Sequence, residues 1–373
     1  MSTLLFVLTL LLCAGSSGRA AAAPASAGVK LYTGEIERAK FVIARPAQWN
    51  GAVLLLAHGF RDVKSPLVAD LNPDHLACRT LLDGGWVVAT TSYRRNGMII
   101  RDAIADLENL RAHISALCGE PRRVVLEGDA MGGAIVTLIA EQFADHYQGA
   151  VAVDAALQTR GSKDPLTFNL QPQIPLVFLT NQSELDGARK YAAAPFAQQN
   201  RALVLEVRRD GPVNVNQRER LVALRTLIDL IDHQPVALPT VPDAPMFFDA
   251  TQEPVPGSSQ VRPLDEGGFE ARVTEVTAIS GDLVLNAQLS DFSATDIAPD
   301  TWFELIAKGQ SYRVLYGRNL ASVKPWQWVA FPDADGFFNL TQNSAHEAST
   351  AAATIGLEAG DPVVIHRLPQ DSG

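Results

Sequence analysis

The sequence has few cysteines, few positive charges and no long apolar run beyond its first 27 residues. Three cysteines are too few for a disulfide scaffold, and none of them forms the CxxC spacing of a zinc site. Lys and Arg number 31 against 41 Asp and Glu, a formal charge of −10, which argues against a nucleic-acid partner. Past residue 27 no stretch approaches the roughly 20 apolar residues of a membrane helix.

What the sequence does contain is enough apolar material for buried cores. Apolar residues make up 47% of the chain and charged residues 19%, which argues against general disorder. At roughly 150 residues per domain, a chain of 373 residues predicts two domains.

The first 27 residues resemble a targeting signal. The apolar stretch Leu4–Cys13 is too short to span a bilayer, and the small residues Ala25-Ser26-Ala27 form an A-x-A cleavage site. We therefore expect a signal peptide at residues 1–27 and a secreted or periplasmic protein. An uncleaved anchor is the alternative, because no Lys or Arg precedes the apolar stretch. Cleavage would leave Cys78 and Cys118, on two helices expected to cover opposite faces of a sheet, which favours two buried thiols over the alternative of a disulfide.

Residues 28–233 alternate between short apolar runs and helical patterns. Continuous apolar runs are typical of strands buried on both faces, and their alternation with helices predicts an α/β fold with a mostly parallel sheet. The expected strands are Val53–Ala57, Trp86–Thr90, Val124–Glu127, Ala150–Val153, Leu176–Thr180 and Leu203–Val207. The expected helices include Ile99–Leu117, Gly132–Phe143 and Gln217–Ile231, and Glu35–Ala44 is expected to form one edge strand.

The last third of the chain has a different character. Seven of the 22 prolines lie between Pro235 and Pro263, so residues 234–268 are interpreted as an extended linker. Residues 269–373 alternate with a strand period and contain turn signals, which predicts a small all-β barrel or sandwich with one helix around Ala345–Thr354.

The most informative stretch is Val124–Gly133, VVLEGDAMGG. A strand followed by G-x-nucleophile-x-G and a helix is the nucleophile elbow of the α/β-hydrolase fold. In this frame Gly128 and Gly132 flank Ala130, whose methyl group cannot attack a carbonyl carbon.

A frame centred on Asp129, as in enzymes with a carboxylate nucleophile, is disfavoured. It would require small residues at positions 127 and 131, and the chain has Glu127 and Met131 there. Ala130 therefore stands at the nucleophile position.

Several motifs make residues 30–233 similar to the secreted serine esterases and peptidases of α/β-hydrolase fold. These motifs are His58-Gly59-Phe60-Arg61 after the first long strand, Ser92–Gly97 (SYRRNG) after the next, and GDAMGG in place of GxSMGG. The resemblance implies an oxyanion loop at His58, Gly59 and Phe60 and a pocket that also includes Asp129 and Met131.

The same resemblance places the catalytic acid at Glu184, with Asp186 as the alternative, and the catalytic base at position 212, which is Pro212. Because proline has no imidazole, two of the three triad groups are missing. We expect a pseudo-hydrolase that binds a small-molecule or peptide ligand, with no cofactor or metal. The alternative is a serine hydrolase, active with an unrecognised base or deliberately inactivated.

The acidic residues near the elbow and the arginines near the final helix are interpreted differently. Asp129, Asp154, Glu184 and Asp186 could converge at the carboxyl edge of the sheet, where ligands bind in α/β folds. The arginines near the final helix are interpreted as a solvated face; they are Arg208, Arg209, Arg218 and Arg220.

Residues Phe269–Leu368 resemble the C-terminal β-barrel of the S-adenosylmethionine hydrolase and halogenase family. The matching stretches are ARVTEVTAISGDLVLN and GFFNLTQNSAHEASTAAATIGLEAGDPVVI. Gly281-Asp282 replaces that family's Gly-Asn, and no neighbouring N-terminal domain of that family is present. The barrel could be the functional module, or it could cover a sheet edge or mediate assembly.

Overall fold

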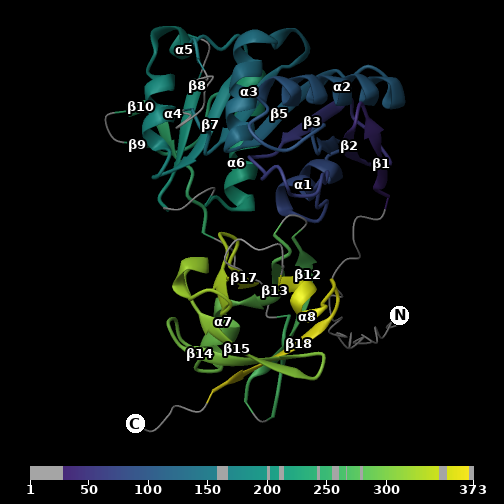
Figure 1. Ribbon diagram of the computed structural model, residues 1–373. Helices are drawn as coiled ribbons and strands as arrows, with labels where there is room; N and C mark the ends of the chain where they lie inside the picture. The colour runs from purple at the N-terminus through teal and green to yellow at the C-terminus, as the bar shows by residue number, and fades with distance from the viewer. Residues whose placement is uncertain are drawn as a thin grey trace, which may run out of the picture.

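The computed structural model describes two domains joined by the proline-rich segment (Figure 1). It describes residues 28–157, 167–199, 202–209, 214–241, 244–253, 260–265, 267–277, 280–343 and 351–368. The expected signal peptide lies outside this range. Among the helices described, none has the length and apolar character needed to cross a bilayer.

The first domain is built on a twisted, mostly parallel sheet. The strand order is β1-β2-β4-β3-β5-β6-β7-β8-β10-β9, and the central strands from β4 to β8 run parallel. The central strands are β3 (Ala52–Ala57), β4 (Val87–Thr91), β5 (Arg123–Asp129), β6 (Gly149–Val153), β7 (Leu176–Asn181) and β8 (Ala202–Val207). The predicted apolar runs are therefore confirmed as buried strands.

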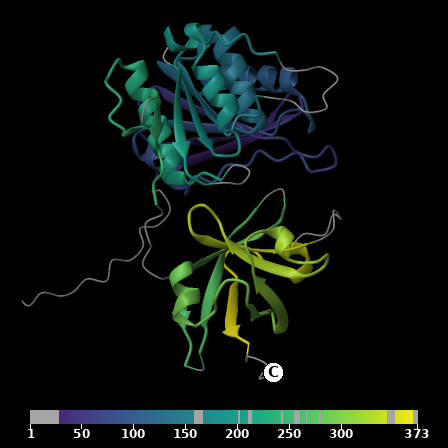
Figure 2. The same ribbon diagram turned by 90° about the vertical axis from the view of Figure 1, so that its left-hand side faces the viewer.

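Helices pack on both faces of this sheet, as Figure 2 shows. One core contains residues of α2 (Ile100–Cys118), α3 (Met131–Gln142) and α4 (Leu185–Ala192), and the other contains residues of α1 (Leu76–Asp83) and α6 (Gln217–Ile231). The short helix α5 (Pro195–Gln199) precedes β8. Neighbouring strand residues point to opposite cores, Leu54 to one and Leu55 to the other. This confirms the predicted α/β class with helices on both faces.

The two cysteines lie in these separate layers. Cys78 is buried in the core under α1, whereas Cys118 ends α2 on the opposite face, and both are free thiols. Cys78 is buried as expected, whereas Cys118 is only half-buried.

The predicted single strand Glu35–Ala44 is wrong. It is a hairpin of β1 (Lys30–Ile36) and β2 (Ala39–Arg45), in which Ile36 pairs with Ala39. The two turn residues, Glu37 and Arg38, have φ values of 47° and 74°. Such turns usually carry Asn or Gly, so this turn gave no sequence signal.

Part of the proline-rich segment joins the first domain. Strands β9 (Thr240–Val241) and β10 (Ala244–Asp249) extend the sheet at its edge, and β10 runs parallel to β8. Prolines are tolerated near a sheet edge because an edge backbone has fewer ladder hydrogen bonds to lose.

The second domain is a closed barrel of seven strands. They are β12 (Phe269–Val276), β13 (Leu283–Gln288), β17 (Phe337–Gln342), β16 (Trp328–Pro332), β15 (Gln310–Tyr316), β14 (Trp302–Ala307) and β18 (Pro362–Arg367), with β18 paired back to β12. The short β11 (Arg262–Pro263) adds to β12. The predicted small barrel is confirmed.

Two helices contribute to the barrel core. Helix α7 (Leu289–Ala294) was not predicted, and its Phe292 stacks on Phe338 with ring centroids 3.8 Å apart. The expected helix around Ala345–Thr354 overlaps α8 (Ala351–Ile355), and its first residues lie outside the described range.

Candidate functional site

Ala130 occupies the sharp turn between β5 and α3. Its backbone dihedrals are φ 49° and ψ −106°, a region that non-glycine residues rarely adopt. Its N–H donates to Val153 O at 2.9 Å, and its carbonyl accepts from the N–H groups of Ala134 and Ala156. Such strain costs on the order of 1–3 kcal/mol and persists because the surrounding structure holds it.

The flanking glycines are required by close backbone approach. A Cβ atom on Gly128 would lie 2.2 Å from the carbonyl oxygen of Gly132, and one on Gly132 would lie 1.9 Å from that of Ala57. The turn is therefore pressed against the end of β3, and no side chain fits at either position.

The loop after β3 lies directly beside this turn. A Cβ atom on Gly59 would lie 3.7 Å from the Cβ of Ala130 and 3.2 Å from the carbonyl oxygen of Asp129. Phe60 is 57% exposed, whereas Met131 is buried at the start of α3. The structure thus brings Gly59, Asp129, Ala130 and Met131 together.

His58 is held as a neutral, structural side chain. Its Nδ1 lies 2.7 Å from the carbonyl oxygen of Gly59, so Nδ1 carries the proton and donates it. Its ring packs on Tyr93 at 4.0 Å between centroids, and Tyr93 Oη donates to His58 O at 3.2 Å. Burial, reinforced by the charge of Arg61, lowers the pKa of His58 to about 4. A general base works best with a pKa near the operating pH, so His58 is poorly suited to that role near pH 7.

A buried ion cluster ties the elbow strand to α6. Arg220 Nη1 lies 2.5 Å from Glu127 Oε1, and Arg220 Nη2 lies 2.8 Å from Asp129 Oδ1. The Arg220 side chain is only 14% exposed, and its two carboxylate partners raise its pKa despite the burial. The interpretation of Arg220 as part of a solvated face is therefore wrong.

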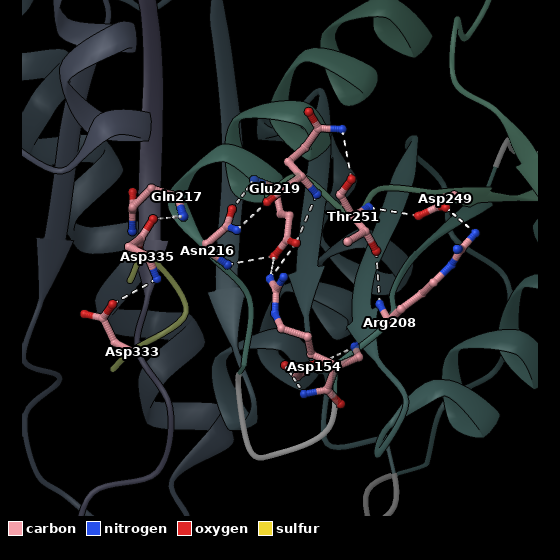
Figure 3. Close-up of polar contacts among 12 residues, drawn as sticks. Asp154, Arg208, Asn216, Gln217, Glu219, Asp249, Thr251, Asp333 and Asp335 are labelled. Carbon is pink, nitrogen blue, oxygen red and sulfur yellow. Dashed lines mark hydrogen bonds and ion pairs between the residues drawn. The ribbon is translucent and has the colours of Figure 1, made fainter. Parts of the chain in front are cut away.

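Asp154 forms a second buried polar contact at the end of β6 (Figure 3). Its carboxylate accepts from Asn181 N at 2.7 Å and from Asn181 Nδ2 at 3.2 Å, at the end of β7. Burial raises the pKa of Asp154 to about 6. Ala130 N donates to the carbonyl oxygen of Val153, the residue before Asp154. The carboxyl group with this raised pKa therefore lies close to the elbow.

The two predicted acids lie at the start of α4. Glu184 is the residue before the first helical residue, and Asp186 is in the first turn; both side chains are exposed. Neither is enclosed in the way that a catalytic carboxylate usually is.

Pro212, at the predicted base position, lies outside the described residues. The described residues before it lie beside the loop after β7, since Gln182 N donates to Arg209 O at 3.1 Å. Arg209 also forms an ion pair with the buried Glu219 of α6 at 2.5 Å.

The proline-rich segment is fastened to the start of α6 (Figure 3). Asn216 and Glu219 form a capping box, and Asn216 Nδ2 donates to Gln252 O at 2.7 Å. Arg208 forms an ion pair with Asp249 at 2.5 Å, and its N–H donates to Thr251 Oγ1 at 3.1 Å.

The barrel also reaches this edge of the first domain. Asp335, in the turn before β17, accepts the N–H of Gln217 at the first residue of α6, at 3.0 Å. Glu275 of β12 accepts from Asn72 at 2.6 Å and lies 3.3 Å from His75, at the start of α1. Helices that follow parallel strands begin at the carboxyl edge of the sheet, so the barrel docks on the edge that carries the elbow.

Across the described ranges, no three His, Cys, Asp or Glu side chains are grouped so that they could hold an ion.

No family model matches the chain. Over 81 residues it is 31% identical to Lipase 2 of Moraxella sp. (strain TA144), a match that covers 20% of this chain and spans about a fifth (19%) of the lipase.

Similar solved structures include an esterase of Pyrobaculum calidifontis (TM-score 0.41, 15% identity, 55% of this chain and 85% of that one). A bacterial heroin esterase matches with a TM-score of 0.40 and 15% identity, over 55% of this chain and 83% of that one. An acylaminoacyl peptidase of Pyrococcus horikoshii matches with a TM-score of 0.38 and 11% identity, over 50% of this chain and 38% of that one. These neighbours are hydrolases by name. The first domain has the α/β-hydrolase fold by its own strand order β1-β2-β4-β3-β5-β6-β7-β8 and the sharp turn between β5 and α3.

Proposed function

We propose that this chain is an exported pseudo-hydrolase, which binds an ester- or peptide-type ligand beside Ala130 and does not turn it over. The observation that carries the proposal is the methyl group of Ala130 in the strained turn between β5 and α3. The turn presents its side chain where a nucleophile would stand, and no hydroxyl is there.

Two further observations support the loss of the triad. Position 212 is proline in the sequence, and the low pKa of His58 makes it a poor substitute base. In a protease whose triad has been dissected, losing the serine or the histidine alone costs about a millionfold in rate.

The backbone groups beside the turn at Ala130 favour ligand binding. Gly59 lies beside the turn and Met131 follows Ala130, and in a hydrolase the N–H groups of residues at such positions form the oxyanion hole. Arg220 pairs with the carboxylate of Asp129 next to them. A carbonyl oxygen can be held by such N–H groups without any nucleophile. The rival hypothesis is a serine hydrolase, natural or deliberately inactivated, that uses Glu184 or Asp186 as its acid.

Fluorophosphonate labelling of the purified protein separates the two hypotheses. We expect no serine of the wild type to be labelled, as read by mass spectrometry of the digested protein. Labelling of any serine in the wild type would establish the rival.

A variant series tests the residue assignment. Ala130→Ser together with Pro212→His should restore labelling at position 130 and some hydrolysis of short acyl esters, while each single change restores little. Ala156→Ser, which places a serine beside the turn, is the matched control and should stay unlabelled. A folded double variant that remains inert to both reagents would show that the triad positions are wrongly assigned.

A further inference from the structure

The barrel carries an aromatic groove that is lined by barrel residues alone. The groove has a volume of about 470 Å³ and is lined by four aromatic residues, together with Ser311, Arg313 and Gln327. The aromatic residues are Trp302, Tyr312, Trp326 and Trp328, so three of the five tryptophans of the chain lie in this one place. Strands β14 and β15 are on the side of the barrel away from the first domain (Figure 1).

The groove forms where β15 extends past the start of β16. The two strands begin to pair only at Val314 and Trp328, so residues 311–313 of β15 pair with β14 on one side alone. Trp326 and Gln327 precede β16 and border the gap.

Trp326 is held in place at a conformational cost. Its φ is 70°, which is unusual for a bulky residue, and the residue is 48% exposed. Its N–H donates to Asn343 O at 2.6 Å, and its carbonyl accepts from Gln342 Nε2 at 3.0 Å. A strained backbone that presents a large apolar side chain to solvent is typical of a functional site.

The other side chains give the groove both flat and polar surfaces. Trp328 is only 8% exposed and meets Tyr312 edge to face, with centroids 5.4 Å apart, and the Arg313 guanidinium lies 5.0 Å from the ring centre of Trp302. The Ser311 hydroxyl donates to Glu304, which leaves its oxygen free to accept.

We propose that this groove binds a neutral oligosaccharide. A sugar ring has a face of slightly positive C–H groups, which suits the negative face of an indole, and a rim of hydroxyl groups. Planar guanidinium and amide groups, as in Arg313 and Gln327, can bond two neighbouring hydroxyls at once, and the Ser311 oxygen can accept from a third.

Two other ligands that use aromatic grooves fit less well. Single-stranded nucleic acid stacks on such rings but needs a basic surface, and this chain has a formal charge of −10. A proline-rich peptide offers almost no donors, so the Ser311 oxygen would gain no partner from it, whereas Gln327 Oε1 already accepts from Lys324 N at 3.0 Å. The oligosaccharide proposal does not depend on the proposed function of the first domain.

The test uses the full chain and three probes, cellohexaose, chitohexaose and laminarihexaose. We expect at least one of them to bind, as measured by calorimetry, and to shift the tryptophan fluorescence. Trp326→Gly should weaken this binding at least about tenfold, as for an aromatic hot spot, while the thermal midpoint stays near that of the wild type because glycine tolerates φ 70°.

A matched control is Leu320→Ala. Leu320 is also an exposed apolar residue of the barrel but does not line the groove, so its removal should leave binding unchanged. The proposal fails if no hexaose binds at millimolar concentration, if Trp326→Gly binds as the wild type does, or if decaproline binds more tightly than every hexaose.

Discussion

Replacing Arg220 by methionine tests whether the buried ion cluster supports the elbow. The substitution keeps the side-chain length and removes the positive charge that faces Glu127 and Asp129. The Glu127 side chain is 6% exposed, so its carboxylate would be left buried without a partner. Asp129 is 37% exposed and can regain water, so it contributes little to the cost.

The expected cost depends on pH. Breaking a buried pair by removing one partner costs about 3–5 kcal/mol, so we expect the free energy of unfolding of the first domain to fall by about 3 kcal/mol at pH 8. Burial already raises the pKa of Glu127, and losing Arg220 raises it further. The folded variant therefore binds a proton more readily than the unfolded chain, and its stability rises as the pH falls through the folded pKa. The loss should therefore be smaller at pH 5 than at pH 8.

Urea unfolding followed by circular dichroism at pH 5 and pH 8 provides the measurement. Arg225→Met is the control, because Arg225 is exposed on the same helix and its loss should cost less than about 0.5 kcal/mol. Adding Glu127→Gln to Arg220→Met should recover part of the loss at pH 8. A loss that is equal at both pH values, or below 1 kcal/mol at pH 8, would refute the reasoning.

Two further predictions concern the same edge of the sheet. Burial raises the pKa of Asp154 to about 6, so the folded state should lose about 3 kcal/mol of stability in all as the pH rises through that value. Asp154→Asn should therefore flatten the dependence of the unfolding free energy on pH between about 4 and 7. An unchanged slope would contradict this prediction. Asp335→Ala removes the acceptor for Gln217 N and should loosen the docking of the barrel on the first domain. We expect a larger radius of gyration in small-angle scattering and severalfold faster proteolysis between the domains. The control Asp300→Ala, at an exposed turn of the barrel, should change neither quantity.

Local patterns were enough to predict most of the secondary structure. The bounds of α6 match the predicted Gln217–Ile231, and the apolar runs became strands because both faces of a central sheet are covered. The turn at Glu37-Arg38 was missed because its positive φ values occur without glycine or asparagine. Alternation continues through that hairpin, so the pattern alone could not divide it.

The polar contacts of the site depend on residues far apart in the sequence. Arg220 and Glu127 are 93 positions apart, and Asp335 and Gln217 are 118 apart, so spacing along the chain carried no information about either pair. One signal was present for the first pair. Glu127 lies within the apolar strand VVLEGD, where its side chain would be buried, and a buried carboxylate requires a cation or a proton.

The elbow shows why this motif is weak evidence for catalysis. Gly132 is pressed against Ala57 of β3, and Gly133 is confined too, though less tightly, because a Cβ there would lie 2.9 Å from Ala155. The glycines therefore hold β3, β5 and α3 together whatever residue stands at position 130. A chain without the nucleophile still needs these glycines for packing, so the glycine motif can persist after catalytic activity is lost. It follows that activity in this fold has to be argued from the reactive groups themselves, and at position 130 that group is a methyl.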